Sequence, residues 1–289
     1  MTADRALSIL LGPCPPEALP YAHAERWVLN NMATDEAALR GVGEGWLPPL
    51  VRTYINPPSV VLGLSRRIAK DVDVAACAAR EVVVTRRASG GGTVYHDRGT
   101  LNVSWILPWS WLPGCGPKSP LDNATAIFLD QVIAACREAG APLPRRTRIS
   151  DVSVGDPPRK VAGSGQLRKA HAILHHTSIL IDLDLAAMIA VLPNPPDRPD
   201  IDHRDFVTSL ESVADLRRPG WRLEPDGLPP EELPALRLTL ALQEATLAYF
   251  GATIAPLLGD NEPGITALEA AREALILEKY RDPGWVGRL

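Results

Sequence analysis

The chain has 289 residues, enough for one large domain or two small ones with a sizeable buried core. Hydrophobic residues make up 46% of it and charged residues 22%, as is usual for a globular protein in water. The formal net charge of −4 argues against a general nucleic-acid binder, which would be basic overall. Basic residues gather instead in two stretches, at 86–87 and 145–169, which predicts a local anion site.

The cysteines and the apolar runs indicate the compartment. Four cysteines lie far apart, at Cys14, Cys77, Cys115 and Cys136. Without CxxC spacing they predict neither a zinc site nor a disulfide framework, and they favour a reducing compartment. No apolar run has the length of a membrane span, and the run near the N-terminus is too short for a secretion signal. We therefore expect a cytoplasmic protein without membrane or nucleic-acid partners.

The first half of the chain alternates short strands with helices. Apolar residues at helical spacing predict an amphipathic helix over residues 21–32. Short strands are expected at 51–54, 59–64 and 82–85, with an alanine-rich helix at 73–80. Residues 101–107 alternate apolar and polar side chains as a half-buried strand does, which places Asn102 on one face and Trp105 on the other.

The second half contains the clearest helix, expected over 121–139 with Gly140 at its end. Strands are predicted at 146–154 and 173–181, and a second glycine-containing element lies between them at 159–166. Further elements are a short helix at 184–192, a loop at 193–202, and helices at 234–250 and 265–280. This pattern indicates an α+β fold, with a mixed, largely antiparallel central sheet and helices packed on it, rather than a Rossmann alternation.

A glycine-rich stretch at 86–96 is the sharpest candidate for a binding loop. Arg86 and Arg87 precede three consecutive glycines, Gly90–Gly92. Without Cβ atoms the glycine N–H groups can face an anion closely, and two guanidiniums supply further donors. A plain tight turn is the alternative. Ser89 precedes the glycines, but no base for it is evident in the sequence, so a nucleophilic role is not expected.

Lys160 is the candidate for charge stabilisation. It follows a turn and precedes Gly163, where its ammonium group can reach a carboxylate and a phosphate together. An exposed surface lysine is the alternative. His175 and His176 are adjacent on a predicted strand and so point to opposite faces, and at least one of them is expected to be structural. No HxH, HExxH or GxSxG motif is present.

Three blocks of sequence, in this order, resemble the lipoate–protein ligase family, within the larger group of biotin and lipoate ligases and octanoyl transferases. They are NPPSVVLG at 56–63, RRASGGGTVYHDRGTLN at 86–102 and KVAGSGQLRKAHAILHHTS at 160–178. Biotin ligases carry a GRGRxG loop instead of the second block. The resemblance implies a fold like that of class II synthetases and biotin–lipoate ligases, in one catalytic domain over 1–289.

The family activates lipoate with ATP as lipoyl-adenylate and passes the lipoyl group to a lysine of a carrier domain. By resemblance, Lys160 is the catalytic residue and stabilises the charge that develops during activation. Arg87 and the Gly90–Gly92 backbone would hold the acyl carbonyl and α-phosphate, and Asn102 would help to orient them. Arg168 would line the nucleotide side, His175 the acyl-chain tunnel, and Asp151 would help to hold Mg²⁺. The other residues assigned to the substrate and adenylate site are Ser89, Gly91, Tyr95, His96, Gly163 and Ser164.

Departures from the family pattern leave other activities open. Thr177 replaces the glycine after the histidine pair, Gly165 replaces an alanine, and Ser150 replaces an asparagine. A related octanoyl or lipoyl transferase takes its acyl group as a thioester and uses a catalytic cysteine. In one branch this cysteine lies about a dozen residues before the Lys160 position, where the present chain has none. A non-catalytic carrier-binding module is the third interpretation, and an intact Lys160 speaks against it.

The resemblance also implies partners. The carrier is expected to be a glycine-cleavage H-like protein, the lipoyl domain of a dehydrogenase E2 component, or a specialised carrier. Many lipoate ligases have a small C-terminal accessory domain, whereas here residues 279–285 resemble the end of the catalytic domain and four residues follow. We therefore expect no accessory domain in this chain, and a small accessory subunit that assists activation of free lipoate.

Overall fold

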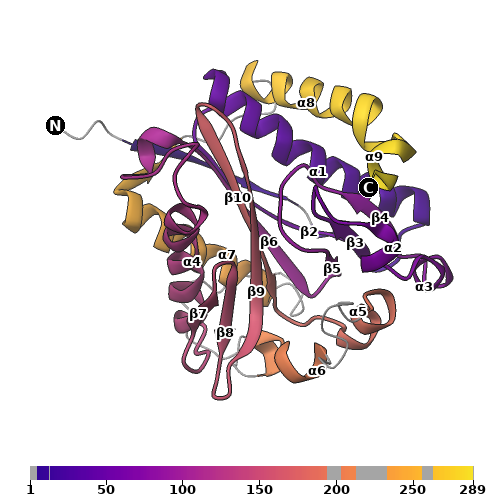
Figure 1. Ribbon diagram of the computed structural model, residues 1–289. Coiled ribbons are helices and arrows are strands. Elements are labelled where there is room, and N and C mark those ends of the chain that lie inside the picture. The colour runs from indigo at the N-terminus through magenta and orange to yellow at the C-terminus, as the bar shows by residue number, and fades with distance from the viewer. Residues whose placement is uncertain (1–4, 13, 194–202, 213–232, 256–262, 289) are drawn as a thin grey trace.

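Strands with one apolar and one polar face build an eight-stranded sheet at the centre of the molecule (Figure 1). The structure is a computed structural model that describes residues 5–12, 14–193, 203–212, 233–255 and 263–288. Among the described strands, the two pairings of β1 are parallel and the others in this sheet are antiparallel. From edge to edge the strands are β11 (Ala252–Ile254), β1 (Arg5–Leu11), β2 (Leu50–Ile55), β6 (Thr100–Pro108), β10 (Ala172–Leu180), β9 (Arg159–Arg168), β8 (Asp151–Val154) and β7 (Arg145–Arg148).

A second, three-stranded sheet carries the glycine-rich loop. Its order is β4 (Val83–Arg86), β3 (Ser59–Leu62) and β5 (Val94–His96). β3 pairs in parallel with β4 and antiparallel with β5. The predicted binding loop is thus the connection from β4 to β5, and both of its ends are fixed by the central strand of this sheet.

Helices cover both faces of the large sheet (Figure 1). On one face α1 (Tyr21–Glu44) packs on the strands, and α8 (Pro263–Leu275) packs on α1. On the other face lie α4 (Leu121–Glu138) and α7 (Leu233–Phe250). The shorter helices are α2 (Ile68–Asp71), α3 (Val74–Ala79), α5 (Leu185–Val191), α6 (His203–Phe206) and α9 (Pro283–Gly287), with 3₁₀ turns at Trp109–Trp111 and Leu210–Ser212 and a π-helical turn at Ile276–Tyr280. Within the ranges given above, no helix is both long and apolar enough to cross a membrane.

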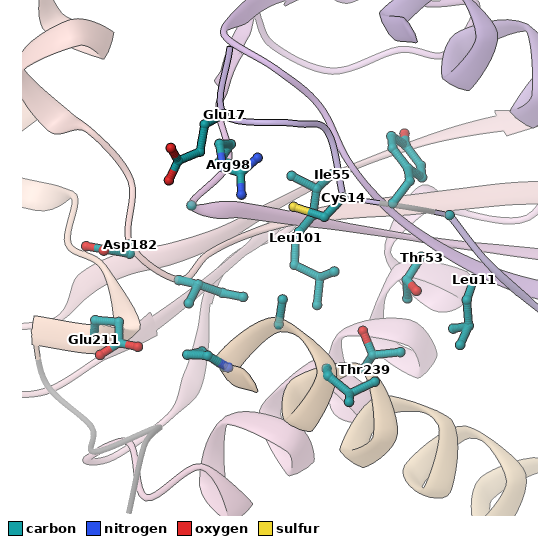
Figure 2. Close-up of a pocket in the computed structure, with 17 residues that line it drawn as sticks. Leu11, Cys14, Glu17, Thr53, Ile55, Arg98, Leu101, Asp182, Glu211 and Thr239 are labelled. Atoms are coloured by element: carbon teal, nitrogen blue, oxygen red, sulfur yellow. The ribbon is translucent and has the colours of Figure 1, made fainter. Parts of the chain in front are cut away.

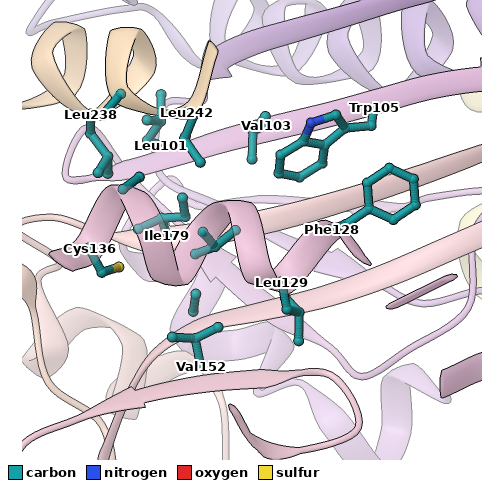
Figure 3. Packing of buried hydrophobic residues seen from close by; sticks show 14 of the residues in the cluster. Leu101, Val103, Trp105, Phe128, Leu129, Cys136, Val152, Ile179, Leu238 and Leu242 are labelled. Carbon is teal, nitrogen blue, oxygen red and sulfur yellow. The ribbon is translucent and has the colours of Figure 1, made fainter. Parts of the chain in front are cut away.

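The two faces of the large sheet differ in polarity. Apolar side chains of the central strands, such as Val103 and Trp105 of β6, pack against Phe128 of α4 and Leu238 of α7 (Figure 3). The opposite face carries polar residues that α1 covers. There Arg52 of β2 forms a buried ion pair with Asp35 of α1, with Nη1 2.6 Å from Oδ1. The predicted alternation along β6 is confirmed, and it directs the polar residues toward α1.

Several predicted elements differ in extent. The first helix continues to Glu44, twelve residues beyond the predicted range. The predicted strand at 146–154 is wrong, because the chain turns back at 149–150 and forms the hairpin of β7 and β8. The glycine-containing element at 159–166 is part of the ten-residue strand β9. β1 was not predicted, and residues 194–202 of the predicted loop lie outside the described residues.

Candidate active site

A cavity of about 100 Å³ between the two sheets collects many of the predicted residues. The large sheet contributes side chains from β8, β9 and β10, the small sheet from β3 and β5, and α1 covers the site. Its lining is mostly polar and includes Ser150, Asp151, Lys160 and Ser164 on one side and Arg87, Thr93, His96, His176 and Ser178 elsewhere, with an apolar patch formed by Met32, Val61 and Val94. Such a lining suits a ligand with an anionic group and a hydrocarbon chain.

Lys160 is held in this cavity by its neighbours on β8 and β9. Its ammonium Nζ lies 2.8 Å from Oδ1 of Asp151, and its side chain remains 31% exposed. A Cβ on Gly163 would lie 2.8 Å from Nζ of Lys160, so this glycine leaves the room that the lysine head needs. The carbonyl of Lys160 accepts a hydrogen bond from the N–H of Thr208, which fixes the backbone. The site therefore contains an oriented cation that an incoming anion can reach.

Arg87 holds the glycine loop from inside. Its guanidinium donates to the carbonyls of Gly90 (2.8 Å) and Gly92 (2.7 Å) through Nη2, and to the carbonyl of Val61 (3.0 Å) through Nη1. Burial lowers the pKa of Arg87 to about 10, so the group stays protonated at neutral pH. Gly92 lines the cavity, and the N–H of Gly90 donates to the carbonyl of Gln166 on β9. Arg87 therefore shapes the loop and adds positive potential to the cavity.

A serine–histidine pair lies beside the loop. Nε2 of His176 is 2.6 Å from Oγ of Ser89, which also accepts a hydrogen bond from Nε of Arg87 at 3.0 Å. Burial and the charge of Arg87 lower the pKa of His176 well below its usual range, so the imidazole is neutral and shares a hydrogen bond with the hydroxyl of Ser89. No base for Ser89 was evident in the sequence, because the fold brings His176 to it from a distant part of the chain.

A second polar chain runs from β5 to the large sheet. Nδ2 of Asn56 donates to Nδ1 of His96 (3.0 Å), and Nε2 of His96 lies 2.9 Å from Oγ of Ser178. Ser178 donates in turn to Oδ1 of Asn102 (2.8 Å). Nδ2 of Asn56 can only donate, so Nδ1 of His96 accepts this hydrogen bond. The proton of the neutral His96 ring is therefore on Nε2. Burial, with a contribution from Arg87, lowers the pKa of His96 to about 3. Asn102 therefore does not line the cavity itself, but it accepts a hydrogen bond from Ser178, which does.

Of the predicted residues that do not line the cavity, Ser89, Gly90, Gly91 and Asn102 lie directly behind its lining, whereas three others point away from it. His175 is fully buried on the opposite face of β10, where it stacks on Phe128 with ring centroids 4.5 Å apart. Tyr95 points into a core cluster beneath the small sheet, because it alternates with Val94 and His96 along β5. Arg168 lies at the far end of β9 from Lys160 and donates to the carbonyls of Ser119 and Pro120. These three residues therefore do not line the cavity around Lys160, and their roles at the substrate or nucleotide stay predictions.

Sequence reasoning missed some cavity residues that lie next to predicted site residues in the chain. His176 and Ser178 line the cavity in place of His175, and Ser150 lines it on the turn before Asp151. The alternation along a strand shows that one histidine of the pair faces away from the site. It does not show which one, because that depends on which face α4 covers.

The donor set does not fit a protein-held Mg²⁺. The carboxylate of Asp151 is already paired with Lys160. Throughout the described part of the chain, no group of three or more His, Cys, Asp or Glu side chains is placed to hold a metal ion. Mg²⁺ requires near-octahedral oxygen ligands, which substrate phosphates often supply in part. Asp151 therefore orients Lys160, and the expectation that it holds Mg²⁺ has no support in this geometry.

A larger cavity of about 470 Å³ lies on the opposite face of the large sheet, beside α7. Figure 2 shows Ile55 and Leu101 in its middle and several charged side chains together at one end. These charged residues are Glu17, Arg98, Asp182 and Glu211. Three carboxylates against one guanidinium disfavour a carboxylate or phosphate ligand. The smaller cavity around Lys160 is therefore the better candidate for anion chemistry.

Comparisons with known proteins show the family and the fold of the chain. A family model described as the lipoyl protein ligase A/B catalytic domain matches residues 28–220. An octanoyltransferase LipM from Kyrpidia tusciae is 32% identical over 275 residues, which covers 88% of this chain and 93% of that protein. Two solved structures share the fold. One is a bi-partite lipoate protein ligase from Thermoplasma acidophilum, described with its E2 lipoyl domain (TM-score 0.75, 22% identity, 99% and 97% of the two chains). The other is a lipoate-protein ligase A bound with ATP (TM-score 0.72, 21% identity, 99% and 100% of the two chains).

Proposed function

The chain belongs to the lipoyl protein ligase A/B catalytic-domain family, and on that premise we propose that it is an ATP-dependent lipoate–protein ligase. It activates lipoate with ATP as lipoyl-AMP and transfers the lipoyl group to a lysine of a carrier domain. The observation that carries this proposal is the oriented pair of Lys160 and Asp151 in a cavity that also has an apolar patch, formed by Met32, Val61 and Val94.

Lys160 acts by electrostatic stabilisation in both steps. In the first step a carboxylate oxygen of lipoate attacks the α-phosphorus of ATP, and pyrophosphate leaves. In the second step the carrier amine attacks the acyl carbonyl, AMP leaves, and the amine loses a proton. Negative charge grows on non-bridging phosphate oxygens first and on the carbonyl oxygen afterwards. An ammonium group beside both positions stabilises these transition states more than the ground states.

The rest of the site binds and orients the acyl group. The hydrocarbon chain lies along Met32, Val61 and Val94, which leave no charge to desolvate. The neutral His176 borders the same space without adding a charge. The backbone at Gly92, held in place by Arg87, faces the activated carbonyl and phosphate.

A carrier with a lipoyl-type domain is the acceptor in this proposal. The Thermoplasma acidophilum neighbour is described together with its E2 lipoyl domain, which supports an acceptor of that kind. The lysine of the carrier must reach the carbonyl held beside Lys160, whose half-exposed side chain leaves the polar part of the cavity open to solvent.

Octanoyl transfer from a thioester donor is the second candidate, because the relative from Kyrpidia tusciae is named an octanoyltransferase. A transferase that forms an acyl-cysteine needs a thiol at the cavity. The chain has four cysteines, and none of them lines the cavity around Lys160. This observation favours the adenylate route.

Replacing Lys160 tests the proposal. With enzyme in excess over lipoate, so that slow activation is still seen, we expect lipoyl-AMP and pyrophosphate to form only when ATP and lipoate are both present. Lys160→Ala should lower this rate by about 10²–10³-fold, by analogy with removal of an oxyanion donor. Lys160→Arg should rescue it poorly, because a planar fork does not replace a point charge. Lys169→Ala, at an exposed lysine, is the matched control. Adenylate formation by Lys160→Ala at the wild-type rate would exclude this role for Lys160.

A further inference from the structure

The turn between β7 and β8 forms one side of the cavity entrance. Arg148 is the last residue of β7, and in the strand register it lies opposite Asp151, the first residue of β8. Of the two residues between them, Ile149 is 59% exposed and Ser150 lines the cavity. The N–H of Ser164 donates to the carbonyl of Ser150 at 2.8 Å, which anchors this turn to β9. The backbone that carries the exposed side chains at 148 and 149 is therefore anchored next to the cavity.

The charge of Arg148 is directed to solvent. β7 is the last strand of the large sheet among the described residues (Figure 1). Arg146 pairs with Asp122, with Nη1 2.8 Å from Oδ1, and Arg145 donates to the carbonyls of Leu143 and Gly155. For the exposed Arg148 the described residues provide no ion pair. An exposed cation beside an exposed isoleucine is an arrangement that suits a protein partner.

Exposed cations also stand near the glycine loop. Arg67 and Lys70 are exposed on the segment that follows β3. Asp71 of the same segment accepts a hydrogen bond from Oγ1 of Thr93, which lines the cavity. Exposed positive charge therefore lies on this segment as well as on β7.

We propose that Arg148 and Ile149 form a docking surface for an acidic carrier domain whose acceptor lysine enters the cavity. The inference rests on the proposed function, because only a reaction with a protein lysine requires a macromolecule at this entrance. Carboxylates near the acceptor lysine pair with Arg148, and an apolar side chain beside them covers Ile149. The contact steers the carrier and fixes the orientation of its lysine. Contact between Arg148 and the nucleotide phosphates is the competing interpretation.

The experiment measures transfer from saturating lipoyl-AMP to two acceptors. One acceptor is the apo lipoyl domain of a dehydrogenase E2 component, and the other is hydroxylamine, which needs no docking. We expect Arg148→Glu to raise KM for the lipoyl domain at least tenfold at low salt. At high salt the increase in KM should be smaller, because salt screens the charge. We expect transfer to hydroxylamine to stay within twofold of the wild type. Ile149→Asp should also raise KM for the lipoyl domain and leave the hydroxylamine reaction unchanged.

The matched control is Lys118→Glu, which makes the same change of charge on the loop next to Ser119, near the far end of β9. It should keep KM for the lipoyl domain within twofold of the wild type. An unchanged KM in Arg148→Glu would overturn the docking surface, and so would a raised KM for lipoyl-AMP with an unchanged KM for the domain. Failure of the wild type to transfer lipoyl from lipoyl-AMP to either acceptor would instead overturn the proposed function.

Discussion

At the scale of single residues, the spacing of Lys160 and Gly163 has a direct geometric cause. The head of the lysine side chain occupies the volume that a Cβ at position 163 would need, and the same head pairs with Asp151. The sequence showed the lysine and the glycine together, and the structure explains why they belong together. The charge pair and the missing Cβ act as one unit.

Gly163→Ala tests this unit. The new Cβ meets only the flexible end of Lys160, 2.8 Å from Nζ, so the backbone can stay in place while the ammonium moves. We expect the free energy of unfolding to change by less than about 1 kcal/mol, while the rate of lipoyl-AMP formation falls at least tenfold. Urea denaturation and a single-turnover assay measure the two quantities. Equal activity of the variant and the wild type would show that the position of Nζ does not matter.

The buried histidines predict how stability depends on pH. Burial lowers the pKa of His175 to about 3, from its usual value near 6.5. Between these values the unfolded chain binds a proton that the folded chain does not, so stability falls as pH decreases below about 6.5 and is constant above it. His175→Leu removes this contribution and should reduce, by that of one proton, the slope of the unfolding free energy between pH 6 and 4, to which His96 and His176 also contribute. His171→Gln, at an exposed histidine, is the control, and identical slopes in both variants would contradict the assignment.

The histidine pair also shows where sequence reasoning stops at this scale. Adjacent residues on a strand face opposite sides, which the sequence does predict. Which histidine lines the cavity depends on the pairing of β10 with β6, where His175 lies opposite Trp105 and shares its apolar face. This register comes from the packing of α4 and α7, which no local pattern contains.

At the scale of elements, Arg86 joins segments that are distant in sequence. It is fully buried, and its guanidinium donates to the carbonyls of Gly63 and Arg66 after β3. It also donates to the carbonyls of Trp285, Val286 and Arg288 in the C-terminal segment. The sequence assigned both arginines of the loop to an anion. The structure separates them, because Arg86 anchors α9 to the small sheet while Arg87 shapes the glycine loop.

Arg86→Met tests this anchor. The change leaves several carbonyls without a charged donor, so we expect the free energy of unfolding to fall by about 3 kcal/mol or more. Arg86→Lys should recover part of this loss, and Arg80→Met, at an exposed position, should stay within about 0.5 kcal/mol of the wild type. Urea denaturation measures all three. A loss of less than about 1 kcal/mol in Arg86→Met would contradict the anchoring role.

The elements were predicted best where periodicity is strong. The helix at 121–139 and the strand at 101–107 are confirmed within about two residues at each end. The hairpin of β7 and β8 was read as one strand, because the run from Arg145 to Asp151 contains no glycine or proline to mark its turn. β9 was read as a loop because of Gly163 and Gly165, which are instead strand positions that face Lys160 and the carbonyl of Gly90.

At the scale of the whole molecule, the fold and family could be predicted from the order of three motifs, and both are confirmed. The chemical mechanism could not, because lipoate ligases and octanoyltransferases share the fold, and the nature of the acyl donor leaves little trace in it. The expectations of an undivided catalytic domain over 1–289 and of a small accessory subunit stay predictions.

Cysteine chemistry gives a prediction at this scale. Burial raises the pKa of the Cys136 thiol to about 12 and that of Cys77 to about 11, so both are poor nucleophiles. We expect the variant with all four cysteines replaced by alanine or serine to transfer lipoyl from lipoyl-AMP as the wild type does, per folded molecule. Replacing buried thiols lowers stability, so the folded fraction has to be measured. An acyl-enzyme thioester trapped at any cysteine would place the protein among the transferases.

The most direct test of the central claim compares two acyl donors with one acceptor. The purified chain is mixed with an apo lipoyl domain and supplied either with lipoyl-AMP or with an octanoyl group held as a thioester on an acyl carrier. Mass spectrometry of the lipoyl domain then reports the acyl group transferred. The account predicts rapid modification from lipoyl-AMP that is lowered in Lys160→Ala, and none from the thioester. Modification from the thioester alone, with lipoyl-AMP inert, would contradict it.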